Sequence, residues 1–193
     1  ISLSGQGKYG ADSAECIKYL SYYKEYYKQK NYDDALPNWR KAYSLCPPTA
    51  NQTMLIDGTT LMRQLIAKNK NNSVYKSALV DSLLKIHDIR AEYYPKYAET
   101  ALNNKGLDMV NYLQDEPKDL YEGLKSIISV NKENSRPQFF LFLFNAACSL
   151  YESGVLTADD VLNDFSVAMS YMDKMPADEN TEKMRTDIEN LLA

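Results

Sequence analysis

The sequence predicts an all-α protein built from antiparallel helix pairs. The second, fourth, sixth and eighth expected helices begin near residues 32, 73, 117 and 158, a spacing of about 42 residues that is typical of stacked helix pairs. Apolar residues follow helical spacing within these segments. No segment alternates apolar and polar residues over the length of a strand, so we expect no sheet.

Capping signals and breaks set the expected helix boundaries. In a capping box, two residues three positions apart each accept a hydrogen bond from the other's backbone N–H at the start of a helix. Three residue pairs have this spacing: Asp12–Glu15, Thr49–Gln52 and Ser135–Gln138. Thr157 with Asp160 is a weaker version. Pro95 and Pro117 suit a first helical turn, because their missing N–H would be unpaired there anyway. The nine expected helices span residues 12–30, 32–46, 51–68, 73–93, 95–114, 117–131, 136–153, 158–174 and 179–192.

These elements imply one domain. We expect residues 1–11 to be a flexible N-terminal segment and residues 12–193 to be a single helical-repeat domain, either whole or a fragment of a longer array. The helix at 179–192 is then the first half of a fifth pair. If its apolar stripe of Met184, Ile188 and Leu191 is left exposed, it could support a weak homodimer.

Composition argues against two classes of partner. The net charge is −4 and no basic stripe is present, which argues against nucleic acid because phosphates need clustered Lys and Arg. The longest apolar run, residues 139–144, is far shorter than the roughly 18 residues of a membrane span. We therefore expect no transmembrane segment.

No catalytic or metal-binding constellation is visible, so we expect no enzyme, no cofactor and no metal. The only histidine, His87, lies between Ile86 and Ile89, which favours a structural role at the helix edge. One helical face carries carboxylates that could hold a cation, at Asp81, Asp88 and Glu92, but a solvated charged face is the more common meaning of this pattern.

The first helix pair resembles the tetratricopeptide repeat over residues 16–47. The stretch from Tyr26 to Leu36 is similar to the middle of that motif, and Trp39, Ala42 and Pro47 follow at its spacings. Tyr23 departs from it, because the family prefers a small residue there. The resemblance implies a right-handed solenoid of about four antiparallel helix pairs plus a terminal helix. The period of about 42 residues keeps HEAT-like helix pairs, at about 40–47, as the alternative.

The resemblance also implies where a partner binds. In tetratricopeptide folds the first helix of each pair lines the concave surface, so Lys24, Tyr27 and Lys28 would face that groove. We expect a scaffold that binds a protein or peptide segment there, since Tyr provides a large contact area at modest entropic cost. The alternative is a glycan-capture component of a bacterial cell envelope, because aromatic faces can stack on sugars.

Cys16 and Cys46 are expected to form a disulfide. Each lies 15 positions from Asn31, the turn of the first hairpin, so antiparallel helices bring them level. The whole chain also resembles, more loosely, uncharacterised repeat proteins exported to the cell envelope of Gram-negative anaerobic bacteria. We therefore expect a periplasmic or envelope location; the alternative is a cytoplasmic protein with two free thiols. Cys148 should be a lone buried thiol.

Overall fold

The computed structural model describes residues 7–193, and these residues form nine α-helices and three short 3-10 helices. The α-helices are α1 (Ser13–Lys28), α2 (Tyr32–Leu45), α3 (Gln52–Lys68), α4 (Ser73–Tyr93), α5 (Ala98–Tyr112), α6 (Pro117–Asn131), α7 (Pro137–Glu152), α8 (Ala158–Met172) and α9 (Glu179–Leu192). The 3-10 helices are η1 (Pro48–Ala50), η2 (Pro95–Tyr97) and η3 (Lys132–Asn134). No strand occurs in residues 7–193, so the predicted all-α class is confirmed. Within the same range no helix is both long and apolar enough to span a bilayer.

Asparagine side chains cap several helix starts that the sequence analysis assigned to other residues or left unassigned. Asn31, Asn51 and Asn72 each accept a hydrogen bond from a backbone N–H in the first turn of the following helix. The predicted Thr49–Gln52 capping box is therefore wrong. Thr49 lies inside η1, and α3 begins only after Asn51.

Of the other predicted caps, only the weakest forms completely. Thr157 and Asp160 make both bonds of a capping box at the start of α8. Asp12 occupies the cap position of α1 without a side-chain bond. The Ser135–Gln138 box is wrong, because Arg136 precedes α7 and the buried Ser135 hydroxyl has no hydrogen-bond partner.

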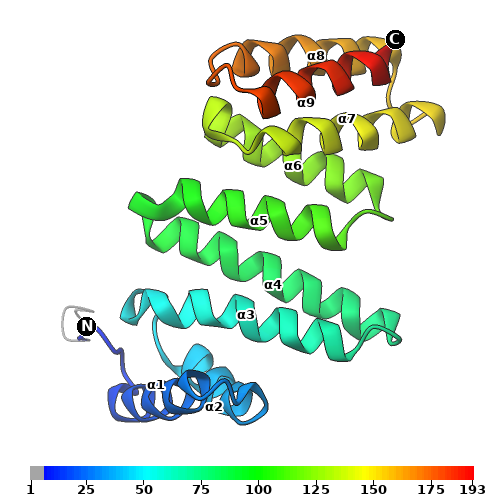
Figure 1. Cartoon of the computed structure of the whole chain (residues 1–193). Helices are drawn as coiled ribbons and strands as arrows, with labels where there is room; N and C mark the ends of the chain where they lie inside the picture. The colour runs from blue at the N-terminus through cyan, green and yellow to red at the C-terminus, as the bar shows by residue number, and fades with distance from the viewer. Residues whose placement is uncertain (1–6) are drawn as a thin grey trace, which may run out of the picture. The chain divides into compact units, whose positions relative to one another are not determined.

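The chain divides into two compact units, and the division falls inside α5, between Ala101 and Leu102. In the first unit α1 packs against α2, α3 packs against α4, and α2 also contacts α3 (Figure 1). In the second unit α6 packs against α7, which also contacts α8 and α9. Within each unit, neighbours in sequence are thus mainly neighbours in space, as expected of helix pairs. The single repeat domain over residues 12–193 stays a prediction.

Part of the segment predicted to be flexible, residues 1–11, lies outside the described residues, which begin at Gly7. From there the chain forms a turn, in which the N–H of Gly10 donates to the carbonyl of Gly7 over 3.0 Å. Gly10 has a φ of 75°, a conformation that favours glycine, and it lies against the ring of Pro47.

The first hairpin, α1 with α2, is closed by the predicted disulfide. Cys16 and Cys46 are bonded, with their Cα atoms 5.1 Å apart, so the register counted from Asn31 is confirmed. Ala35 and Ala42 are completely buried, as small residues are where two helices approach closely.

Trp39 fixes this hairpin to α3. Its indole N–H donates to the backbone carbonyl of Met54 over 2.7 Å, and Tyr43 stacks on its ring at a centroid distance of 4.8 Å. On α3, Gly58 lies so close to the indole that an added Cβ would stand 2.3 Å from Cζ2. Glycine is therefore required at position 58 by the bulk of Trp39.

Helices α1 and α7 end in the same way. After α1, Lys30 has a φ of 57°, and after α7, Gly154 has a φ of 79°. In both turns this left-handed residue donates to the carbonyl three residues back, and the next N–H donates to the carbonyl five residues back. This is the Schellman closure of a helix.

The helices that follow these two turns have similar residues at the same spacing. In α2 and α8 two small or β-branched residues lie seven positions apart, with an aromatic residue four positions after the first: Ala35, Trp39 and Ala42 in α2, and Val161, Phe165 and Ala168 in α8. Phe165 packs edge-on against Phe144 of α7, with ring centroids 6.1 Å apart. The α7–α8 hairpin therefore repeats features of α1–α2 that the sequence analysis did not find beyond the first pair.

Helix α9 is present at the predicted residues and packs against α7. From its stripe, Ile188 is completely buried and Met184 half-buried, whereas Leu191 is exposed. Most of the stripe is therefore used inside the second unit. The weak homodimer stays a prediction.

Candidate functional site

The three residues predicted to face a groove lie together on the C-terminal half of α1. Lys24 and Lys28 are exposed and one helical turn apart, and Tyr27 between them is half-buried. Neither lysine forms an ion pair within the described residues. The α1 face, defined here as Lys24, Tyr27 and Lys28, thus combines two exposed cations with one aromatic ring.

Helix α3 holds the aromatic part of this face in place. The fully buried Tyr23 donates its hydroxyl to Oδ2 of Asp57 over 3.1 Å. The Tyr27 hydroxyl is hydrogen-bonded to Asp57 as well, and also to Thr60. All three bonds run from α1 to α3, which are the first helices of two successive pairs.

The rings of neighbouring tyrosines complete the support of Tyr27. Its ring lies edge-on to Tyr23, at a centroid distance of 6.5 Å, and to Tyr32, at 5.4 Å. Tyr27 is therefore held by two hydrogen bonds and two ring contacts. A side chain held in this way loses little conformational freedom when a ligand packs against it.

The carboxyl of Asp57 is the electrostatic centre of this cluster. Burial raises its pKa above the ordinary value, while the hydrogen bonds from Tyr23 and Tyr27 and the charge of Lys24 oppose that rise. Burial, followed by the charge of Asp57, raises the pKa of Tyr23. Tyr23 therefore stays protonated and donates to Asp57 throughout the physiological range.

The remaining tyrosines of α1 divide between surface and packing roles. Tyr22 and Tyr26 are exposed, whereas Tyr19 is contacted by the ammonium groups of Lys18 and Lys41, which lie 5.0 and 4.8 Å from its ring centroid. Tyr23, the departure from the tetratricopeptide pattern, is the most deeply buried of them. Its large ring fills the position at which that family has a small residue, and its hydroxyl reaches α3.

Helix α7 carries a related face. Counted back from the left-handed residue of each turn, Lys24, Tyr27 and Lys28 correspond to Cys148, Tyr151 and Glu152. A tyrosine thus stands at the same position in both hairpins. Tyr151 is 52% exposed, whereas Tyr27 is half-buried. Cys148 is a free thiol, as predicted, but it is only half-buried; burial and then the charge of Glu152 raise its pKa. The thiol is therefore protonated at neutral pH.

A second tyrosine–carboxylate contact joins α6 to α8. The Tyr121 hydroxyl donates to the buried Asp164, whose other oxygen lies 3.0 Å from Nζ of Lys125. Both tyrosine–carboxylate contacts link helices that are not consecutive in the chain, α1 with α3 and α6 with α8. Sequence reasoning found neither, because the partners are 34 and 43 residues apart.

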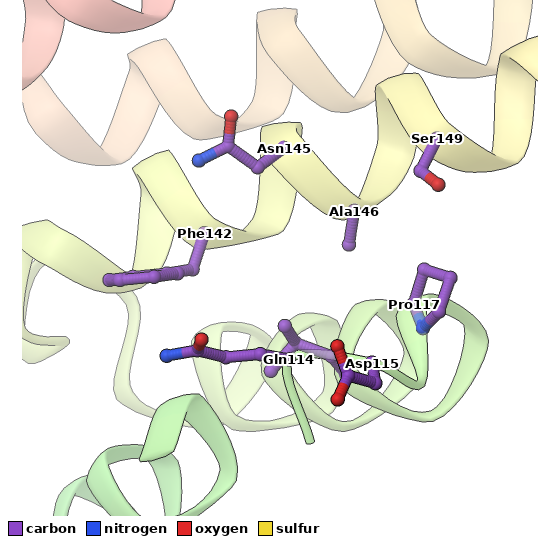
Figure 2. Close-up of a pocket in the computed structure, with 8 residues that line it drawn as sticks. Gln114, Asp115, Pro117, Phe142, Asn145, Ala146 and Ser149 are labelled. Atoms are coloured by element: carbon purple, nitrogen blue, oxygen red, sulfur yellow. The ribbon is translucent and has the colours of Figure 1, made fainter. Parts of the chain in front are cut away.

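A pocket of about 430 Å³ lies between the start of α6 and one side of α7. Figure 2 shows Phe142, Ala146 and Ser149 of α7 on one side, and Gln114, Asp115 and Pro117 on the other. Asn145 also lines it. The lining combines one aromatic ring with two amides, a carboxylate and a hydroxyl. No pattern in the sequence marked this pocket, since its two sides meet only through the packing of α6 on α7.

The other residues singled out in the sequence lie apart from these sites. His87, expected to have a structural role at the helix edge, is buried in α4 and interacts with a neighbouring group there. Asp81, Asp88 and Glu92 are exposed on the same helix. Across residues 7–193 no group of three or more potential metal ligands comes together.

Compared with protein-family models, with curated proteins and with solved structures, the chain matches none.

Proposed function

We propose that this chain is a non-catalytic binding scaffold of the tetratricopeptide kind, and that its α1 face holds a peptide or protein segment. The pairs would stack as a right-handed solenoid, with first helices lining one continuous surface. In two hairpins the first helix ends in the same closure, and the second helix has an aromatic residue at the same spacing between two small or β-branched residues, which supports this kind over HEAT-like pairs.

One observation carries the proposal: Tyr27 is anchored to the next first helix through Asp57 and Thr60, and lies beside two exposed lysines. Tyrosine is one of the residues enriched at the hot spots of binding surfaces. Lys24 and Lys28 favour a partner segment that carries Asp or Glu, so the proposed ligand is an acidic peptide with an apolar or aromatic residue that packs on Tyr27.

The proposed location is the periplasm or cell envelope. Disulfides persist in oxidising compartments, and the Cys16–Cys46 bond closes the hairpin that carries the α1 face. A cytoplasmic protein would keep these two thiols reduced, so the bond favours export.

A peptide array tests this function. The protein should retain acidic peptides selectively, and their affinity should fall as salt is added. The variant Lys24→Gln/Lys28→Gln should lose most of this binding. Lys70→Gln/Lys174→Gln, which removes the same charge from two exposed positions elsewhere, should retain it. Equal binding by the two double variants would refute the α1 face as the site.

The pocket in Figure 2 favours glycan capture as the second candidate function. An aromatic ring with amide, carboxylate and hydroxyl groups around it can stack on a sugar ring and bond to its hydroxyls. Trp39 does not contribute, because it is not among the residues that line this pocket. A glycan array separates the candidates: sugar binding that is lost in Phe142→Ala but kept in Lys24→Gln/Lys28→Gln would favour glycan capture.

A further inference from the structure

A second surface of the first unit carries a pocket of a size that suits a small molecule. A pocket of about 300 Å³ lies between α2, α3 and α4, away from the α1 face. Its apolar lining comes from three helices, with Trp39 from α2, Met62 from α3, and Leu79 and Ile86 from α4. This volume is at the small end of the range for ligand pockets, so the occupant would be a small molecule.

Two cations stand at this pocket, one from each of two helices. Arg40 follows Trp39 on α2, and Lys85 precedes Ile86 on α4. Both are exposed, and neither has an ion-pair partner among residues 7–193. No carboxylate is among the residues that line the pocket, although α4 carries Asp81 one turn before Lys85. The two positive charges of the pocket are therefore not held in an ion pair within residues 7–193, although Asp81 and Asp88 both lie within one helical turn of Lys85.

The aromatic wall is rigid. Trp39 is fixed by its hydrogen bond to the carbonyl of Met54, and Tyr43 stacks on it with an interplanar angle of 18°. Burial raises the pKa of Tyr43, so its hydroxyl remains a donor at neutral pH. Tyr43, Arg40 and Lys85 thus line the same pocket as the apolar residues.

We propose that this pocket binds an amphiphilic carboxylate, with its apolar body on Trp39, Met62 and Ile86 and its carboxylate between Arg40 and Lys85. Charge-assisted bonds to a carboxylate are the strong kind, and Arg offers a planar pair of donors that matches it. An uncharged molecule with the same body would gain the apolar contacts alone. This inference does not depend on the peptide-binding function, which uses a different face.

The single tryptophan of the chain provides a readout, because Trp39 lines the pocket. The probes are octanoate and octanamide, which share an alkyl chain and differ in charge. Titration of the whole protein, followed by Trp39 fluorescence and by isothermal calorimetry, should give saturable binding of octanoate. The affinity for octanamide should be lower than that for octanoate by a factor of about ten or more.

Matched variants complete the test. Arg40→Gln/Lys85→Gln should bind octanoate about tenfold more weakly, whereas Lys70→Gln/Lys174→Gln should bind it as the wild type does. Circular dichroism should show that each variant is folded. No calorimetric binding of octanoate would overturn the proposal. Equal affinities for octanoate and octanamide, or for the two double variants, would overturn it as well.

Discussion

Breaking the Cys16–Cys46 bond should destabilise the first hairpin by a predictable amount. The bond closes a loop with a sequence separation of 30, which restricts the unfolded chain. In the chain-entropy model a loop of this size contributes about 3.7 kcal/mol to the free energy of unfolding. If the first unit unfolds by itself, the melting temperature should fall by roughly 15–30 °C; if the chain unfolds as one, by roughly 7–15 °C.

The assay is urea unfolding of the Cys148→Ala protein, with and without a phosphine reductant. Removing Cys148 prevents exchange with the bonded pair. The triple variant that also carries Cys16→Ala and Cys46→Ala should not respond to reductant, and it serves as the control. A stability loss on reduction of less than about 1 kcal/mol would refute the loop-entropy account. Two free thiols at Cys16 and Cys46 in protein purified without reductant would refute the bond itself.

Three further substitutions test the packing around the α1 face by urea unfolding. Tyr23→Phe should cost about 1–3 kcal/mol, because it removes the more deeply buried of the two tyrosine hydroxyls bonded to the Asp57 carboxylate; an unchanged midpoint would mean that the hydrogen bond contributes nothing. Since the pKa of Asp57 is raised on folding, the wild type should lose stability as pH rises through that pKa, and Asp57→Asn should lack this loss. The stability of Asp57→Asn relative to wild type should therefore increase between pH 4 and pH 7, and a constant difference would contradict the assignment. Ala42→Phe should cost about 1–3 kcal/mol or more by overpacking the hairpin, whereas a loss below about half a kilocalorie would mean that Ala42 does not face its partner helix.

Local signals made most helix positions predictable. Helical periodicity and turn residues act over a few positions, so the boundaries at 32, 73, 117 and 179 agree with the structure. The disulfide was predictable for a related reason, since equal rise per residue allowed the register of one hairpin to be counted from its turn. Caps were less predictable where two candidates compete. Pro48 starts a separate 3-10 turn, and so Asn51 rather than Thr49 caps α3.

Contacts between distant helices could not be predicted. The sequence indicated Tyr27 as a contact residue, but not that Asp57 and Thr60 would hold it, because that depends on which face of α3 meets α1. The similarity of α7–α8 to the first hairpin was missed in the sequence because its turn is longer. Seven residues separate Gly154 from Val161, whereas five separate Lys30 from Ala35, so the motif letters no longer align.

The central claim is that an acidic peptide binds across Tyr27 between Lys24 and Lys28. The most direct test is an NMR titration of the ¹⁵N-labelled protein with a peptide selected on the array. The account predicts that the largest amide shifts fall at residues 24–28 of α1 and around Thr60 of α3. Largest shifts elsewhere, with the α1 face unchanged at saturation, would contradict it.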